Sequence, residues 1–139
     1  MTDLTVSSAQ IGVVFPDNAE IYDFIAAEAL TAGQPVYMLT AAGTVGVADA
    51  NAANKQQFRG IALSTVGAGQ AVSVLKRGHI YGFTLAGDYD SMAYLSDTAG
   101  KLADAAGTLT VIVGRVVGLP DNSNTKILYV VADWLREWS

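Results

Sequence analysis

Few side chains in this sequence are suited to catalysis or metal binding. His79 is the only histidine and cysteine is absent, so a pair of histidine ligands and a thiolate metal site are both excluded. His79 lies between Gly78 and Ile80 at the start of a predicted strand, where a structural or exposed role is far more common than a catalytic one. The sequence therefore predicts no site built on histidine or cysteine.

Asp88 and Asp90 flank Tyr89 and are candidates for acid–base chemistry or for binding a hard cation. A calcium loop requires several oxygen ligands at fixed spacing and a closing bidentate glutamate, and this sequence does not continue in that way. A solvated turn is the preferred interpretation, and Asp97 and Asp104 are interpreted as turn residues too.

Glycine-rich motifs give no better support for an enzyme. Residues 67–69 read Gly-Ala-Gly, but no third glycine follows at the spacing of a dinucleotide-binding loop, and Lys76 does not follow a phosphate-loop pattern. Neither Gly-x-Ser-x-Gly nor His-Glu-x-x-His occurs. We therefore expect a hairpin turn at residues 67–69, and a protein that is not an enzyme and has no catalytic, cofactor-binding or metal-binding residues.

The elements that would position any site occur twice. Residues 34–45 are echoed by residues 90–102, and Tyr37 aligns with Tyr94 in this comparison. Each copy continues with an Ala/Asp stretch, a glycine-centred apolar segment and a segment typical of a β-strand. Two copies are too few for an open solenoid, which needs about three. The repeat therefore predicts one closed domain with internal pseudo-two-fold symmetry.

From residue 36 onward, short apolar segments alternate with glycine-containing turns, a pattern typical of a small β-barrel or sandwich. We predict a mainly β single domain over residues 1–139 with little helix. Its first β half is expected at residues 16–87 and its second at residues 88–131. Residues 17–30 fit either a short helix or a strand.

The two ends of the chain lie outside the repeat. Residues 1–15 predict an extended N-terminal arm, because apolar side chains recur at two-residue spacing. These apolar residues are Leu4, Val6, Ile11, Val13 and Phe15. Residues 132–139 form a C-terminal tail in which Trp134 and Trp138 would share one side of a helical turn. The two tryptophans either cap the barrel or contact an oligomer partner or another protein.

Composition indicates a folded protein with apolar surface. Hydrophobic residues make up 51% of the chain and charged residues 15%, below the usual ~25% for charged residues. The net charge of −5 and the scattered Lys and Arg residues disfavour binding to nucleic acid or to an anionic membrane. The start of the chain lacks signal-peptide features and no apolar stretch approaches the ~18 residues of a membrane span. We expect a soluble product made in a cytoplasm.

Several stretches of the sequence, taken in order, resemble the small capsid cement or head-decoration proteins of tailed bacteriophages. They are residues 29–37 (ALTAGQPVY), 59–63 (RGIAL), 68–78 (AGQAVSVLKRG), 94–100 (YLSDTAG) and 113–117 (VGRVV). The resemblance covers roughly residues 20–131 and does not include the N-terminal residues.

The resemblance implies a compact β-barrel of the β-tulip type, often trimeric, on the outer surface of an expanded icosahedral head. The partners it implies are the major capsid protein and other copies of the chain, with a trimer favoured over a dimer, and the implied location is the virion. In such proteins an N-terminal segment often lies along the shell, which makes residues 1–15 the expected capsid-binding arm. Cement function requires no cofactor.

Two other functions remain open. The same β module suits a tail, baseplate or head-fibre component. A carbohydrate-binding module for attachment to the host would need an aromatic platform, for which Tyr81, Phe83 and Tyr89 are the available cluster. Their spacing is equally typical of a strand in a barrel core.

Overall fold

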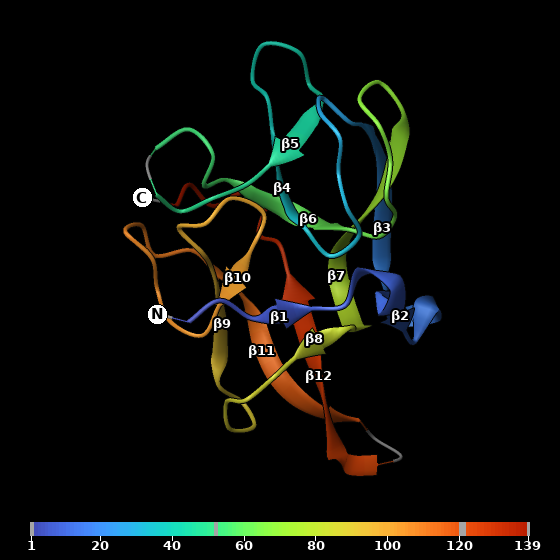
Figure 1. Ribbon diagram of the computed structural model, residues 1–139, viewed down its shortest axis with the longest axis vertical. Helices are drawn as coiled ribbons and strands as arrows, with labels where there is room; N and C mark the ends of the chain where they lie inside the picture. Colours follow the sequence, from blue (N-terminus) through green and yellow to red (C-terminus); the bar gives the residue numbers. More distant parts are fainter. Residues whose placement is uncertain (1, 52, 120–121, 139) are drawn as a thin grey trace.

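The structure is a computed structural model that describes residues 2–51, 53–119 and 122–138. Antiparallel strands form nearly all of its regular structure (Figure 1). In chain order the strands are β1 (Thr5–Val6), β2 (Gly12–Val14), β3 (Glu20–Ile25), β4 (Pro35–Met38), β5 (Val45–Val47), β6 (Phe58–Ala62), β7 (Ala71–Tyr81), β8 (Phe83–Thr84), β9 (Met92–Leu95), β10 (Leu102–Ala103), β11 (Ile112–Leu119) and β12 (Asn122–Val131). The prediction of a mainly β chain is confirmed.

Helical structure is limited to two short 3₁₀ turns in the described residues, at Ser8–Gln10 and Pro16–Asn18. Residues 17–30 therefore contain no α-helix, and β3 occupies their middle. Ile21, Phe24 and Ile25 also have helical spacing, but Val72 and Val74 of β7 offer this segment a pleated apolar surface, so it pairs as a strand. No helix of the described residues has the length and apolar character to span a membrane.

The main sheet is curled into a half-barrel. Its strands follow the order β10-β9-β11-β12-β7-β6-β4-β5, and β2 and β3 pair separately with β7. The first-half strands β4, β5 and β6 lie at one end of this order, and β9, β10 and β11 lie at the other. This order alone does not establish that the two halves are copies of one unit, so the pseudo-repeat stays a prediction.

β7 is the strand that joins the halves. It pairs with β3 and β6 along its first part and with β2 and β12 along its last part. Its alternating sequence buries apolar side chains on both faces, because Val72 and Val74 pack in a smaller cluster while Leu75 and Ile80 pack in the main core. The two cores therefore lie on opposite faces of the same strand.

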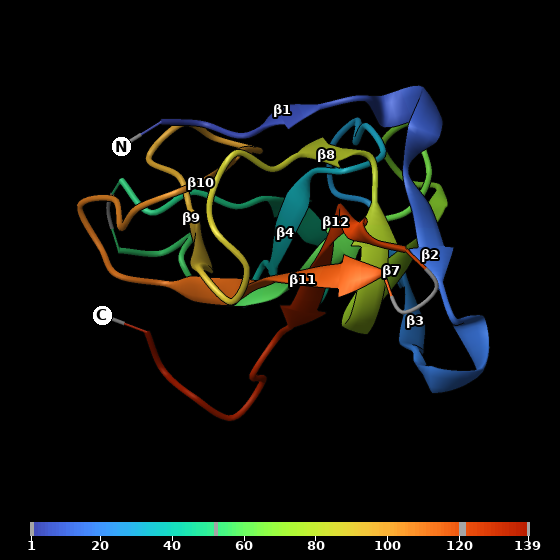
Figure 2. The same ribbon diagram turned by 90° about the horizontal axis from the view of Figure 1, so that it is seen from below.

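The N-terminal residues lie on the domain (Figure 2). The Leu4 N–H donates to the Leu102 carbonyl over 2.8 Å, and the Ser7 N–H donates to the Gly82 carbonyl over 2.8 Å. β1 pairs with β8, and β2 pairs with the end of β7. The predicted extended N-terminal arm over residues 1–15 is therefore not confirmed, because residues 2–7 and 12–14 are bonded to other parts of the domain and Ser8–Gln10 form a 3₁₀ turn.

Candidate partner-binding surface

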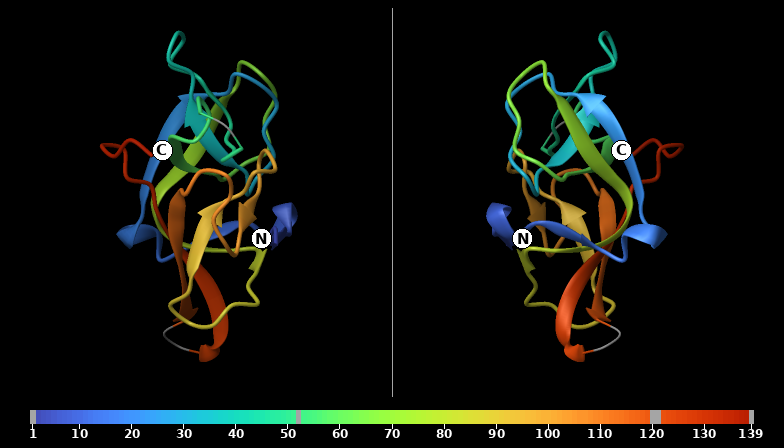
Figure 3. Two further views of the ribbon diagram at one scale, coloured as in Figure 1. Left: turned by 90° about the vertical axis from the view of Figure 1, so that its left-hand side faces the viewer. Right: turned by 90° about the vertical axis from the view of Figure 1, so that its right-hand side faces the viewer.

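β3 carries the main group of exposed apolar side chains. Seven large apolar side chains of the described residues are exposed, and three of them lie on this strand: Ile21 and Tyr22 at 42% and Ile25 at 47%. β3 runs along the outer side of the molecule, where Figure 3 shows it in blue. Apolar groups gathered on an outer strand are a feature of interaction sites rather than of ordinary surface.

Trp134 extends this apolar region beyond the strand. Its ring lies 5.0 Å from the ring of Tyr22 and 6.1 Å from that of Phe24, measured between centroids. Its Nε1 donates a hydrogen bond of 2.9 Å to the carbonyl of Arg59, and Lys76 Nζ lies 4.5 Å from its ring centroid. These contacts fix the indole against the sheet. We call Ile21, Tyr22, Phe24, Ile25 and Trp134 the β3 surface.

Trp138 has a different environment. It is 7% exposed and belongs to the main core. The Gln56 and Gln57 side-chain amides donate to its carbonyl over 3.0 and 3.1 Å, and its own N–H donates to Gln57 Oε1 over 3.1 Å. Its ring Nε1 is buried without a hydrogen-bond partner. Trp138 thus closes the core of its own chain, and its role as a partner contact stays a prediction.

The predicted helical turn that would align the two tryptophans is wrong. Residues 132–138 contain only a short turn, and no helix is present there. The Ala132 N–H still donates to the Lys76 carbonyl over 2.8 Å, and Gln57 then binds the backbone of Trp138. The tail follows the surface of the sheet instead of coiling on itself.

The predicted capsid-binding side chains are half buried. Leu4, Ile11 and Val13 pack against the main core cluster. Val6 lies in β1 beside β8, and the ring of Phe15 makes an edge contact of 5.4 Å with His79. These residues stabilise the domain, and a capsid-binding role for them stays a prediction.

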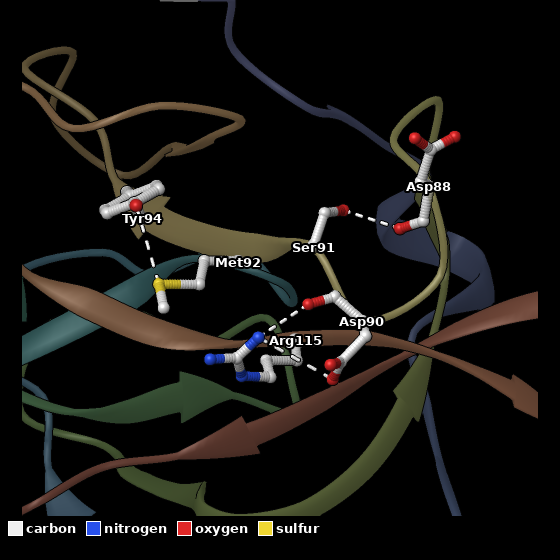
Figure 4. A network of polar contacts seen from close by, with 6 residues as sticks. All are labelled: Asp88, Asp90, Ser91, Met92, Tyr94 and Arg115. Carbon is white, nitrogen blue, oxygen red and sulfur yellow. Dashed lines mark hydrogen bonds and ion pairs between the residues drawn. The ribbon is translucent and has the colours of Figure 1, made fainter.

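The Asp88–Asp90 segment forms an exposed turn (Figure 4). The guanidinium of Arg115 donates a hydrogen bond of 2.6 Å to the Asp90 carbonyl and lies 3.6 Å from its carboxylate. The Ser91 hydroxyl donates to the Asp88 carbonyl over 2.6 Å. Within the described part of the chain, no cluster of His, Asp or Glu side chains has the geometry of a metal site.

His79 is packed between aromatic rings. The ring of Tyr129 lies 4.8 Å from that of His79 and the ring of Phe15 lies 5.4 Å from it, both measured between centroids. Burial among these rings lowers the pKa of His79 below its usual value. The imidazole is therefore a packing element of β7, paired with Val14 of β2 and Tyr129 of β12.

The three side chains of the expected aromatic platform, Tyr81, Phe83 and Tyr89, differ in burial. Tyr81 and Tyr89 are each about half exposed, whereas Phe83 packs against the main core. Lys126 Nζ lies 5.2 Å from the ring centroid of Tyr89. Phe83 thus serves the fold rather than an exposed face.

A hollow of about 650 Å³ lies between the β4–β5 hairpin and residues 53–59. Its polar lining is partly engaged within the chain, because Gln56 binds the Trp138 carbonyl and its Oε1 accepts from the Asn54 N–H. Arg59, also in the lining, is turned toward the Trp134 ring at 5.4 Å. The hollow therefore lacks a convergent set of free polar groups of the kind that orient a small ligand.

Sequence reasoning did not identify the β3 surface. Residues 17–30 fitted two secondary structures, and which side chains of a strand are exposed depends on its neighbours. An available signal was the high apolar content of residues 21–25 next to acidic residues.

No protein-family model, no curated protein and no solved structure matches this chain.

Proposed function

We propose that this protein is a structural virion protein, a cement or decoration protein that binds the outer surface of an icosahedral phage head and stabilises contacts between capsomers. The chain acts as a homo-oligomer, with a trimer favoured, and its partner is the major capsid protein. The proposal starts from the sequence resemblance to phage cement proteins. The curled, mainly β fold is compatible with it.

The observation that carries the proposal is the β3 surface. A cement protein needs apolar contact area on a rigid scaffold, and the β3 surface provides apolar side chains on the two faces of a strand that is fixed to β7 by six register pairs. A standard stable interface buries about 1,600 Å² in total, so neighbouring parts of the domain must contribute as well. Leu135, next to Trp134 in the chain and 96% exposed, is one such contributor.

The test is co-sedimentation of the purified protein with expanded, DNA-free phage heads. We expect Ile25→Asp to reduce occupancy at least about ten-fold, because a carboxylate would have to be desolvated in the contact. Tyr81→Asp is the matched control, since Tyr81 is as exposed as Ile25 but lies at the other end of β7. Equal occupancy for both variants, with unchanged melting temperatures, would contradict the role of the β3 surface.

A further inference from the structure

We propose that the open edge of β3 binds an extended strand of a partner protein, with a Lys or Arg of that strand opposite Asp23 and apolar residues on either side. The inference specifies how the β3 surface is used and rests on the proposed function for the identity of the natural partner. It concerns strand addition to a sheet, a recognition mode in which backbone hydrogen bonds provide affinity and side chains provide specificity.

The backbone of β3 leaves one edge open. The Ala26 N–H donates to the Gln70 carbonyl, and the Ala26 carbonyl accepts from the Gly69 N–H, so the backbone groups of residue 26 face β7. Alternate residues of a strand face opposite edges, which places the N–H and C=O groups of Ile21, Asp23 and Ile25 on the side away from β7.

A second bond supports this assignment. The Ser73 carbonyl accepts from the Leu63 N–H, so Ser73 directs its backbone away from β3, although it is the register partner of Asp23. Asp23 and Ser73 are therefore a pair without mutual backbone bonds. No strand of the described residues pairs with the far edge of β3 before Ile25. Beyond it the Ala27 N–H donates to the Val45 carbonyl over 2.7 Å and Ala26 bridges Val45, so β5 covers that end of the edge.

The side chains of β3 suit an added strand on both faces. Ile21 and Ile25 project on one face, and Tyr22 and Phe24 project on the other beside Trp134. A strand with apolar residues would therefore contact exposed apolar groups whichever face they occupy. The open edge spans about 17 Å at ~3.4 Å per residue, which is the length of an ordinary strand.

The charges on β3 select a basic partner. Glu20 is the register partner of Arg77, so a described cation already lies opposite it. Asp23 accepts a hydrogen bond of 2.8 Å from the Ser73 hydroxyl, and no described cation lies within ion-pair distance of it. A Lys or Arg placed opposite Asp23 would supply the missing charge, and opposite charges across strands stabilise pairing.

A second copy of the chain fits this edge poorly. Two β3 strands related by a two-fold axis pair antiparallel, with opposed side chains on the same face. A register centred on Asp23 places two carboxylates opposite each other, and one centred on Tyr22 places Asp23 opposite Ile21. Neither register gives Asp23 a cation. The carboxylate thus protects the edge against self-pairing and favours a basic strand.

The test uses short blocked peptides of alternating Val and Thr with either Lys or Glu at the centre, added to the full-length protein. We expect the Lys-centred peptide to bind about five-fold more tightly at low salt, with the difference shrinking at 1 M salt. Amide hydrogen exchange should slow at Ile21, Asp23 and Ile25. Equal binding of the two peptides, or unchanged exchange at these amides, would overturn the proposal.

Two variants separate backbone pairing from side-chain contact. Ile25→Pro removes an outward N–H without removing a bond to β7, and should abolish peptide binding while Ile25→Val retains it. Asp23→Lys should reverse the preference, so that the Glu-centred peptide binds more tightly. If Ile25→Pro does not fold, the peptide preference of Asp23→Lys alone tests the proposal. An unchanged preference in that variant would overturn the proposal.

Self-association and head binding are scored separately. Concentration-dependent protection of the β3 amides without peptide would identify a second copy as the occupant and overturn the proposal. If wild-type protein shows the peptide preference but fails to bind phage heads, the proposed function fails and the strand-acceptor inference stands. If heads bind wild type and Ile25→Pro equally, the strand-acceptor inference fails and the proposed function stands.

Discussion

Two strand edges of this domain differ, because one is covered by residues of the same chain and the other is open. The edge of β10 is covered by residues 2–4, which bond to it and bring Leu4 against the core, and the next residues pair with β8 as β1. The edge of β3 is left open and carries exposed isoleucines. Similar apolar, alternating segments thus have different roles, because residues 2–4 cover the edge of β10 whereas β3 pairs with β7 on one side only and leaves its other side uncovered. The covered edge supports stability, and the open edge is available for binding.

The largest effect is expected from deleting residues 2–7. The deletion removes the Leu4–Leu102 and Ser7–Gly82 backbone bonds and uncovers the apolar side chains of β10. We expect the free energy of unfolding to fall by about 3 kcal/mol, measured by urea denaturation. Leu135→Ala, at a fully exposed position, should change it by less than about 0.5 kcal/mol. If the deletion lowers the free energy of unfolding no more than Leu135→Ala does, residues 2–7 are a free arm.

A smaller effect is expected where the N-terminal residues cross β7. Gly82 has φ of +112°, and a Cβ there would lie 2.7 Å from Ile11 Cδ1 and 3.0 Å from its Cα. Gly82→Ala should cost about 2 kcal/mol from backbone strain and displacement of Ile11. Gly43→Ala is the control, because Gly43 also has positive φ but a Cβ would meet no atom within 4 Å. Equal losses in thermal stability would mean that the contact with Ile11 is unimportant.

The next test compares one residue from each edge. Leu4→Ser should lower stability by about 1.5 kcal/mol, because a half-buried apolar side chain is lost from the main core. Ile25→Ser should lower it by less than about 0.5 kcal/mol, because that side chain is already 47% exposed. Both values come from the same denaturation experiment. The contrast between the edges fails if Ile25→Ser is the more destabilising change.

The difference between the edges also shows what the sequence can and cannot predict. The spacing of Leu4, Val6, Ile11 and Val13 predicted extended structure, and Val6 and Val13 lie in the short strands β1 and β2, since strand periodicity is a local property. It did not indicate that β8 and β10 would be the neighbours, because pairing between distant segments depends on the tertiary fold. The open edge of β3 could not be predicted for the same reason. A strand edge is open when no other strand pairs with it, and that depends on the tertiary fold.

The tail illustrates a similar limit. Trp134 and Trp138 have helical spacing, but the amides of Gln56 and Gln57 bind the backbone of Trp138 from a distant loop. Tertiary hydrogen bonds therefore decided the local structure. By contrast, the mainly β character and the exposed turn at Asp88–Asp90 follow from local glycine and aspartate preferences, and the sequence was sufficient for both.

The smallest expected effect concerns His79, which reports how tightly β2 and Phe15 cover β7. Burial lowers the pKa of His79 in the folded protein, so the unfolded chain binds a proton more readily. Stability is therefore fully present above pH ~6.5, the unfolded pKa, and falls as pH decreases toward the folded pKa. We expect the free energy of unfolding to fall by less than about 1 kcal/mol, because the imidazole retains contact with water, and His79→Gln should abolish this pH dependence.

Proton NMR can follow the pKa of the single histidine directly. Phe15→Ala, which removes the ring 5.4 Å away, should move the pKa back toward its usual value if the N-terminal segment provides the burial. An unchanged pKa would assign the burial to Tyr129 and β12, and would show that Phe15 does not shield His79 from water.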